Sequence, residues 1–322
     1  MGILIYCPRS GSTKLAHELG PKGISVIPEF RSFEWLLSRS DTVVSKEALQ
    51  QVWDKDPQIG NLGVVPPLLE SGGSSTGAAV LRAIANAYGL ESGASVVLFK
   101  FGWGVAYRPQ LISAFGPDFP AIALLRDGRA VLNSMQKSRR PYPPHTSMAR
   151  DDSWFAAVQW RKHITQLERD WINTHNRLAV LRFEDLVDRP TATIDELLES
   201  TALRPSSTTG SAFAFAPTEE AIHQLVEKPL DPTRSEAWMS ELSQDDISLA
   251  EHLCGAELER YGYLPVGNPV SSLRLTLSRV NHFWKQIRFS ALSAQVALRG
   301  DATAPLLARA RTRFARIGGL GG

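Results

Sequence analysis

The sequence predicts an α/β protein, a doubly wound parallel sheet of about five strands flanked by helices. The first observation behind this prediction is a series of short apolar runs, rich in β-branched residues, that are typical of buried strands. The second is the helical periodicity of the stretches between these runs. Several runs also end in a polar or basic residue, and ligands of such sheets bind at the carboxyl ends of the strands. The strands are expected at 2–7, 24–28, 95–101, 120–125 and 178–183.

Helices are expected between the strands. The stretch 76–90 is alanine-rich and amphipathic, 154–175 carries apolar residues at helical spacing, and Pro190 suits the first turn of another helix. Loops are expected at 57–75 and 138–152, because proline and glycine clusters break regular structure there. Long loops near a ligand-binding edge often act as lids or shape an acceptor pocket.

Composition and charge indicate one globular domain with a distinct tail. The chain has 322 residues, 43% of them hydrophobic and 21% charged, and its net charge of +2 argues against a general nucleic-acid binder. The Pro/Gly-rich stretch 264–269 predicts a boundary between a catalytic domain at 1–264 and a basic, amphipathic, helical tail at 270–322. The tail has nine basic residues and one acidic residue, a charge of about +8 against about −6 for the remainder. Such a tail is predicted either to lie on an anionic membrane surface or to pack against the catalytic domain or a second subunit.

The most informative segment follows the first strand. After Ile3–Tyr6 comes a loop of small residues with many hydrogen-bond donors, and then a helix; this arrangement suits a phosphate group. It is not a Walker A loop, because Lys14 is not preceded by the required glycine or followed by Ser or Thr. Cys7 lacks the arginine six residues later that a phosphatase loop requires, so we interpret it as a buried residue.

Two motifs carry a resemblance to a known family. The loop Pro8–Thr13 resembles the 5′-phosphosulfate loop of sulfotransferases that use 3′-phosphoadenosine 5′-phosphosulfate. The segment from Arg126 to Ser134 is similar to the 3′-phosphate motif of the same family, R-D-P-R-x-x-x-x-S, with Gly128 in place of proline. Two motifs in the expected order identify the chain as a suspected member of this family, nearest in style to its tyrosylprotein, Golgi-type and bacterial branches.

Three further matches extend the resemblance over residues 2–264. Lys100 ends a strand, as does the family lysine beside the transferred sulfuryl group. The segment 181–186 resembles the strand-ending Y-E-D-L, with Phe183 for tyrosine; we interpret its acidic pair as a structural helix start. Lys228 lies in a stretch similar to a late cofactor loop.

The resemblance implies a P-loop-like transferase that moves a sulfuryl group from this donor to a hydroxyl or an amine. It implies catalytic roles for Arg9 and Lys100 and no metal. The residues expected to bind the donor are Arg9, Ser10, Gly11, Ser12, Thr13, Lys14, Arg126, Ser134 and Lys228. Which of the nearby basic residues completes the 3′-phosphate site stays open among Lys137, Arg139 and Arg140.

The resemblance also points to the general base. The cytosolic branch has a histidine two positions after the strand-ending lysine, and here that position is Gly102. The tyrosylprotein branch has a glutamate after the second strand in an E-x-R arrangement, which Glu29 and Arg31 match, so Glu29 is the expected base. The alternative is that Glu29 is an ordinary acid leading a helix; His17 and His145 are weaker candidates.

Two other functions remain as alternatives. One is a nucleotide or small-molecule kinase, which would need a Walker lysine and an acid to hold magnesium. The other is a non-catalytic protein that binds the donor and docks on a membrane. The acceptor could be carbohydrate, lipid, peptide tyrosine or a small metabolite. Two cysteines and the lack of a long apolar run predict a cytoplasmic protein, at most peripheral to a membrane.

Overall fold

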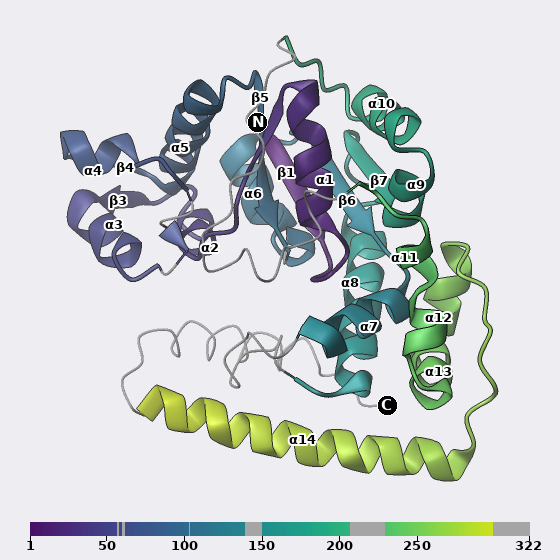
Figure 1. Cartoon of the computed structure of the whole chain (residues 1–322). Coiled ribbons are helices and arrows are strands. Elements are labelled where there is room, and N and C mark those ends of the chain that lie inside the picture. Colours follow the sequence, from purple (N-terminus) through teal and green to yellow (C-terminus); the bar gives the residue numbers. More distant parts are fainter. Residues whose placement is uncertain (57, 60–61, 103, 139–149, 207–228, 299–322) are drawn as a thin grey trace.

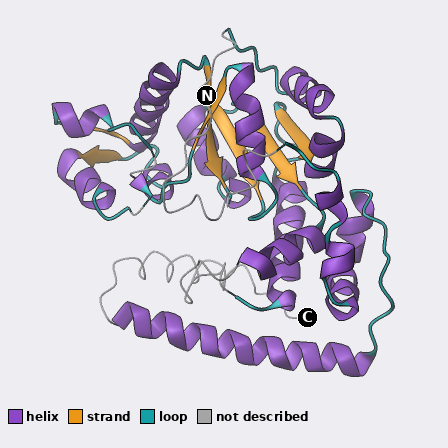
Figure 2. Ribbon diagram, in the orientation of Figure 1, coloured by secondary structure: helices purple, strands orange, loops and turns teal. Residues whose placement is uncertain are grey.

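The computed structural model describes residues 1–298 except 57, 60–61, 103, 139–149 and 207–228. Its centre is a five-stranded parallel sheet with strand order β2-β5-β1-β6-β7 (Figures 1 and 2). This confirms the predicted fold class, and each observed strand lies within the range expected for it. The strands are β1 (Gly2–Tyr6), β2 (Ile24–Ile27), β5 (Val96–Phe101), β6 (Ala121–Leu125) and β7 (Leu178–Arg182).

Helices bury both faces of the sheet. Alternate residues of β1 point to opposite faces, so Ile3 packs in one hydrophobic cluster and Leu4 in the other. The Leu4 side is covered by α1 (Ser12–Leu19), α9 (Phe183–Asp188) and α10 (Pro190–Ser200). The Ile3 side is covered mainly by α5 (Gly77–Ser92), α6 (Arg108–Phe115), α7 (Gly128–Ser138) and α8 (Ser153–Asp170).

Local signals in the sequence start several of these helices. Asp152 caps α8, its carboxylate accepting a hydrogen bond from the Phe155 amide at 3.1 Å. Pro190 occupies the first turn of α10, as predicted. Three further helices lie between β7 and the tail, after α9 and α10: α11 (Thr233–Glu236), α12 (Trp238–Glu241) and α13 (Gln244–Arg260).

The loop expected at 57–75 is only partly correct. Pro67 begins the short helix α4 (Pro67–Ser71), and β4 (Ser74–Thr76) pairs antiparallel with β3 (Val43–Ser45) in a separate two-stranded sheet. These strands carry no apolar alternation, and their pairing joins segments far apart in the sequence, so periodicity could not reveal them. The helices α2 (Ser32–Leu37) and α3 (Lys46–Trp53) complete this region. Of the second expected loop, residues 139–149 lie outside the described residues.

The tail contains one long helix, α14 (Ser272–Leu298), along the lower edge of the molecule in Figure 1. It contacts the region of α8: His282 Nδ1 lies 2.8 Å from Asp152 Oδ2, and its ring stacks on Trp154. The helix therefore packs against the preceding part of the chain. Within the described part of the chain, no helix combines the length and apolar character needed to cross a bilayer. The division into two domains stays a prediction.

Candidate functional site

Three basic residues lie where the central strands end. Arg9 follows β1, Lys100 is near the end of β5, and Arg126 comes directly after β6. Because β1 lies between β5 and β6 and all three are parallel, their carboxyl ends meet at one edge of the sheet. Two of these side chains bond the segment that follows β1: Lys100 Nζ donates to Thr13 Oγ1 at 3.0 Å, and Arg126 Nη1 donates to the Arg9 carbonyl at 3.2 Å.

The loop between β1 and α1 has the backbone geometry of an anion-binding nest. Arg9 and Gly11 both have left-handed conformations, with φ of 73° and 89°. Positive φ on either side of Ser10 turns successive amide groups toward the same side of the chain. Gly11 is also required by space, since a Cβ there would lie 2.3 Å from the ring of Phe183. The helix α1 begins at Ser12, so its positive end faces this loop.

Arg9, Arg126 and Ser134 form one cluster. Arg9 Nε donates to Ser134 Oγ at 3.0 Å, across 125 residues of sequence. The guanidinium of Arg126 lies 4.7 Å from the centre of the Phe183 ring, and its carbonyl accepts a hydrogen bond from Trp160 Nε1 at 2.8 Å. Burial lowers the pKa of Arg126, Glu184 opposes this effect and the charge of Arg9 adds to it. An anion between the two guanidinium groups would relieve their repulsion.

Two buried polar atoms in the β1–α1 loop and at Arg126 have no hydrogen-bond partner among the described residues. Ser10 Oγ and Arg126 Nε are inaccessible to solvent, and neither has a hydrogen-bond partner within the described part of the chain. Buried polar groups are nearly always hydrogen-bonded, so each such atom needs an explanation. Phosphate oxygens would satisfy both donors, and the site therefore fits a phosphate-bearing ligand.

Glu29 lies at the same edge. It follows β2, and its Oε1 accepts a hydrogen bond from the Gly102 amide at 3.3 Å. A Cβ at position 102 would itself lie 3.3 Å from this oxygen. The carboxylate thus adjoins the position that a larger side chain at 102 would take, two residues after Lys100. Arg31 is half-buried at the start of α2.

The other predicted site residues either contact acidic side chains outside the basic cluster or lie outside the described residues. Lys14 forms an ion pair with Glu18 at 2.7 Å along α1. His17 lies on α1 with Nδ1 3.6 Å from the same glutamate. Lys137 forms an ion pair with Glu241 on α12. Lys228, Arg139, Arg140 and His145 lie outside the described residues.

A second group of residues, to which the sequence analysis assigned no chemistry, holds the turn after β6. Glu184 accepts hydrogen bonds from the Asp127 amide at 3.0 Å and from the Tyr263 hydroxyl at 2.9 Å. Burial raises the pKa of Glu184, and the two hydrogen bonds oppose this. Arg129 binds the Asp127 carboxylate and also contacts Glu251. The acidic pair after β7 is the sequence signal for Glu184, but its partners are too distant in sequence to be foreseen.

Cys7 is a buried free thiol, as predicted. Burial raises its pKa to about 12, so the thiolate needed for nucleophilic attack does not form near neutral pH. This excludes a cysteine-phosphatase role for Cys7. In the described part of the chain, no three or more His, Cys, Asp or Glu side chains are grouped to hold a metal ion.

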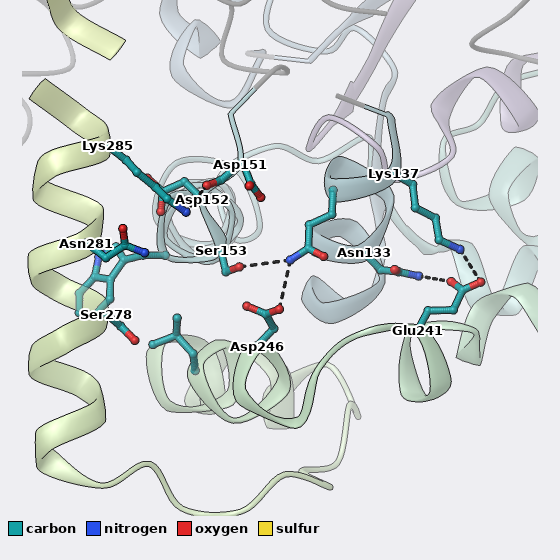
Figure 3. Close-up of a pocket in the computed structure, with 13 residues that line it drawn as sticks. Asn133, Lys137, Asp151, Asp152, Ser153, Glu241, Asp246, Ser278, Asn281 and Lys285 are labelled. Atoms are coloured by element: carbon teal, nitrogen blue, oxygen red, sulfur yellow. Dashed lines mark hydrogen bonds and ion pairs between the residues drawn. The ribbon is translucent and has the colours of Figure 1, made fainter. Parts of the chain in front are cut away.

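A separate polar cavity of about 490 Å³ lies between α7, the start of α8, α13 and α14 (Figure 3). Asn133 and Lys137 face it from α7, whereas Ser134 on the same helix bonds Arg9. None of Arg9, Lys100 and Arg126 lines this cavity. The cavity and the basic cluster are therefore two different features.

Solved structures that resemble this chain identify its fold. A sulfotransferase domain from the curacin biosynthetic pathway superposes with a TM-score of 0.50, covering 80% of this chain and 97% of that domain at 14% identity. The chain has a sulfotransferase fold. A sulfotransferase domain from the Synechococcus PCC 7002 olefin synthase superposes with a TM-score of 0.45 at 20% identity, covering 79% of this chain and 94% of that domain. Sulfotransferase STF9 from Mycobacterium avium superposes with a TM-score of 0.45 at 12% identity, covering 83% of this chain and 78% of that protein. A scan against protein-family models found no match.

Proposed function

We propose that this protein is a sulfotransferase that moves a sulfuryl group from 3′-phosphoadenosine 5′-phosphosulfate to a hydroxyl, or less favourably an amine, of an acceptor. The observation that carries the proposal is the cluster in which Arg9, Ser134 and Arg126 meet beside the glycine-containing loop. The first two motifs of the sequence thus meet at one edge of the sheet, and the fold is compatible with this function.

The two ends of the donor would be held by different groups. The amides of the loop Ser10–Thr13 and the start of α1 would bind the 5′-phosphate. Arg126 and Ser134 would bind the 3′-phosphate, because the guanidinium of Arg126 can donate two parallel hydrogen bonds to phosphate oxygens. The orphan atoms Ser10 Oγ and Arg126 Nε fit this assignment, since each gains an acceptor when the ligand binds.

Charge and proton movement would be handled by Lys100, Arg9 and Glu29. The donor supplies the sulfuryl group when it is bound. Lys100, adjacent to Thr13, would neutralise charge on the side of the leaving phosphate together with Arg9. Glu29 would accept the proton of the acceptor hydroxyl, and its hydrogen bond from the Gly102 amide would hold the carboxylate in position.

The test is transfer of labelled sulfate from the donor to a panel of acceptors: sugars, phenols, sterols and aliphatic alcohols. Wild-type protein should label at least one class. Glu29→Gln should reduce the rate by about 10²- to 10⁴-fold, because it removes the base, and should leave binding of 3′-phosphoadenosine 5′-phosphate unchanged. Glu47→Gln, at an exposed acid on α3, is the matched control and should behave as wild type.

Two outcomes would replace this proposal. Phosphate transfer from ATP with magnesium to the same acceptors, without sulfate transfer, would make the protein a kinase. Binding of the bisphosphate without any turnover, unchanged in Glu29→Gln, would make it a binding protein.

A further inference from the structure

The helix α14 exposes a continuous apolar stripe. Its members recur at intervals of four and three residues, which places them on one side of a helix. They are large side chains, with exposed fractions of 71% for Leu273, 60% for Leu277, 48% for Val280, 59% for Trp284 and 43% for Ile287. Phe283, 59% exposed, adjoins the stripe. A contiguous exposed apolar patch on a protein usually marks a site that binds another protein, a ligand or a membrane.

The opposite side of α14 is fixed to the rest of the protein by polar contacts. His282 binds the buried carboxylate of Asp152, and Gln286 accepts a hydrogen bond from Arg150 at 2.8 Å. Arg150 also lies over the ring of Phe289, 4.8 Å from its centre. A surface helix normally turns its apolar side inward. Here mainly polar contacts hold the helix and leave its apolar stripe exposed. The helix runs along the lower edge of the molecule in Figure 1.

The charges of α14 all have the same sign. The helix carries Arg274, Arg279, Lys285 and Arg288 and has no acidic residue. Arg279 and Arg288 are exposed. Arg274 forms an ion pair with Asp245, and Lys285 donates to the Asp151 carbonyl. The surface around the stripe therefore presents positive charge that α14 itself does not neutralise.

We propose that the outward face of α14 docks on an anionic lipid bilayer, with the helix axis parallel to the membrane plane. Leu277, Trp284 and Ile287 would enter the boundary between headgroups and acyl chains, and Arg279 and Arg288 would contact anionic headgroups. A second copy of the chain is the less favoured occupant. The stripe has heptad spacing over only two heptads, and pairing two such helices would bring cations together without anions to match them.

The experiment is co-sedimentation of the full chain with vesicles of phosphatidylcholine, alone or with 30% phosphatidylglycerol. We expect binding only to the anionic vesicles, weakened by salt. Leu277→Gln/Trp284→Gln should weaken binding at least tenfold, because it removes the buried apolar area. Arg279→Gln/Arg288→Gln should weaken it about fivefold per charge. Leu90→Gln is the matched control, since Leu90 on α5 is 85% exposed and lies outside α14; it should bind as wild type.

Equal vesicle binding by wild type and by the Leu277/Trp284 variant would overturn the proposal. So would the absence of vesicle binding, together with a dimer in analytical ultracentrifugation that this variant dissociates; a second copy would then be the partner. Circular dichroism and thermal unfolding of each variant confirm that it is folded. The assay uses neither donor nor acceptor, so its failure is independent of the proposed transferase function.

Discussion

Two strand–loop–helix corners form the candidate site, and they are stabilised in different ways. In the β1–α1 corner, backbone conformation shapes the loop: two left-handed residues, and Gly11 against the ring of Phe183. In the β6–α7 corner, buried charges hold the turn: Asp127 binds Arg129, and Glu184 accepts from the Asp127 amide. Among the described residues, each corner has a buried donor without an internal partner, Ser10 Oγ in the first and Arg126 Nε in the second, but only the second also holds its turn with buried charged groups. We infer that both corners contribute to donor binding and that the second also provides rigidity.

Removing Arg129 should have the largest effect on stability. Burial lowers its pKa, but Asp127 and Glu251 outweigh this and raise it. Arg129→Leu would remove the cationic partner of the buried Asp127 carboxylate and of the partly buried Glu251 carboxylate, and breaking such a pair typically costs about 3–5 kcal/mol. Urea denaturation measures this. The exposed pair Arg189–Glu196 provides the control, because Arg189→Leu should change the midpoint little. Equal effects of the two substitutions would contradict the structural role of the buried pair.

Gly11→Ala should disturb the first corner. The added Cβ would meet the Phe183 ring at 2.3 Å, in a residue with φ of 89°. We expect a loss of about 2–3 kcal/mol in unfolding free energy and loss of donor binding. Gly116→Ala is a matched control, because Gly116 also has φ of 89° but no atom within 4 Å of the added Cβ. Its effect should be confined to backbone strain. Similar stability losses in both variants would show that contact with Phe183 is unimportant.

Acid should destabilise the helix behind the second corner through His163. This residue follows Trp160 by one turn of α8, and burial lowers its pKa to about 3. The ordinary pKa of histidine is about 6.5, so below that pH the unfolded chain binds a proton that the folded chain does not. Stability is therefore lost as pH falls below 6.5, by about 2 kcal/mol at pH 5.

The measurement is the unfolding free energy of wild type and His163→Leu at pH 7, 6 and 5. The variant should lack this part of the acid loss. His175, whose pKa burial also lowers, contributes in the same direction in both proteins. An unchanged pH dependence in His163→Leu would refute the assignment; His252→Leu, at an exposed histidine, is the control.

Tyr263→Phe should give the smallest effect. It removes the hydroxyl that donates to Glu184 at 2.9 Å and leaves the ring in place. A hydrogen bond to a buried charged group contributes about 1.5 kcal/mol. If the second corner provides rigidity, this variant should also weaken donor binding slightly through the Asp127 turn. Calorimetry of unfolding and of donor binding measures both effects. If neither changes, the Tyr263–Glu184 hydrogen bond does not support the Asp127 turn.

The sequence predicts the sheet because its buried strands are short, apolar and separated by helical periodicity. It also predicts the shared edge of Arg9, Lys100 and Arg126, since parallel strands end together. It does not predict contacts between distant segments, such as the hydrogen bond of Arg9 to Ser134 or the Glu184–Tyr263 pair. The structure explains the two positions that differ from the motifs of the resembled family, Gly128 and Phe183. A Cβ at Gly128 would lie 2.9 Å from Trp160, and the ring of Phe183 packs on Gly11. The sequence does not predict the short strands β3 and β4, because their pairing joins segments that are distant in the sequence.

We propose above all that the cluster at the sheet edge binds the phosphates of the sulfuryl donor. The most direct measurement is isothermal titration calorimetry with 3′-phosphoadenosine 5′-phosphate, beside ATP with magnesium, on wild type, Ser134→Ala and Gln136→Ala. Gln136 lies on the same helix but lines the separate cavity, so it serves as the matched control. We predict saturable binding of the bisphosphate that is about tenfold weaker in Ser134→Ala, from loss of about 1.4 kcal/mol, and unchanged in Gln136→Ala. Binding of ATP with magnesium but not of the bisphosphate, or equal binding by all three proteins, would contradict the account.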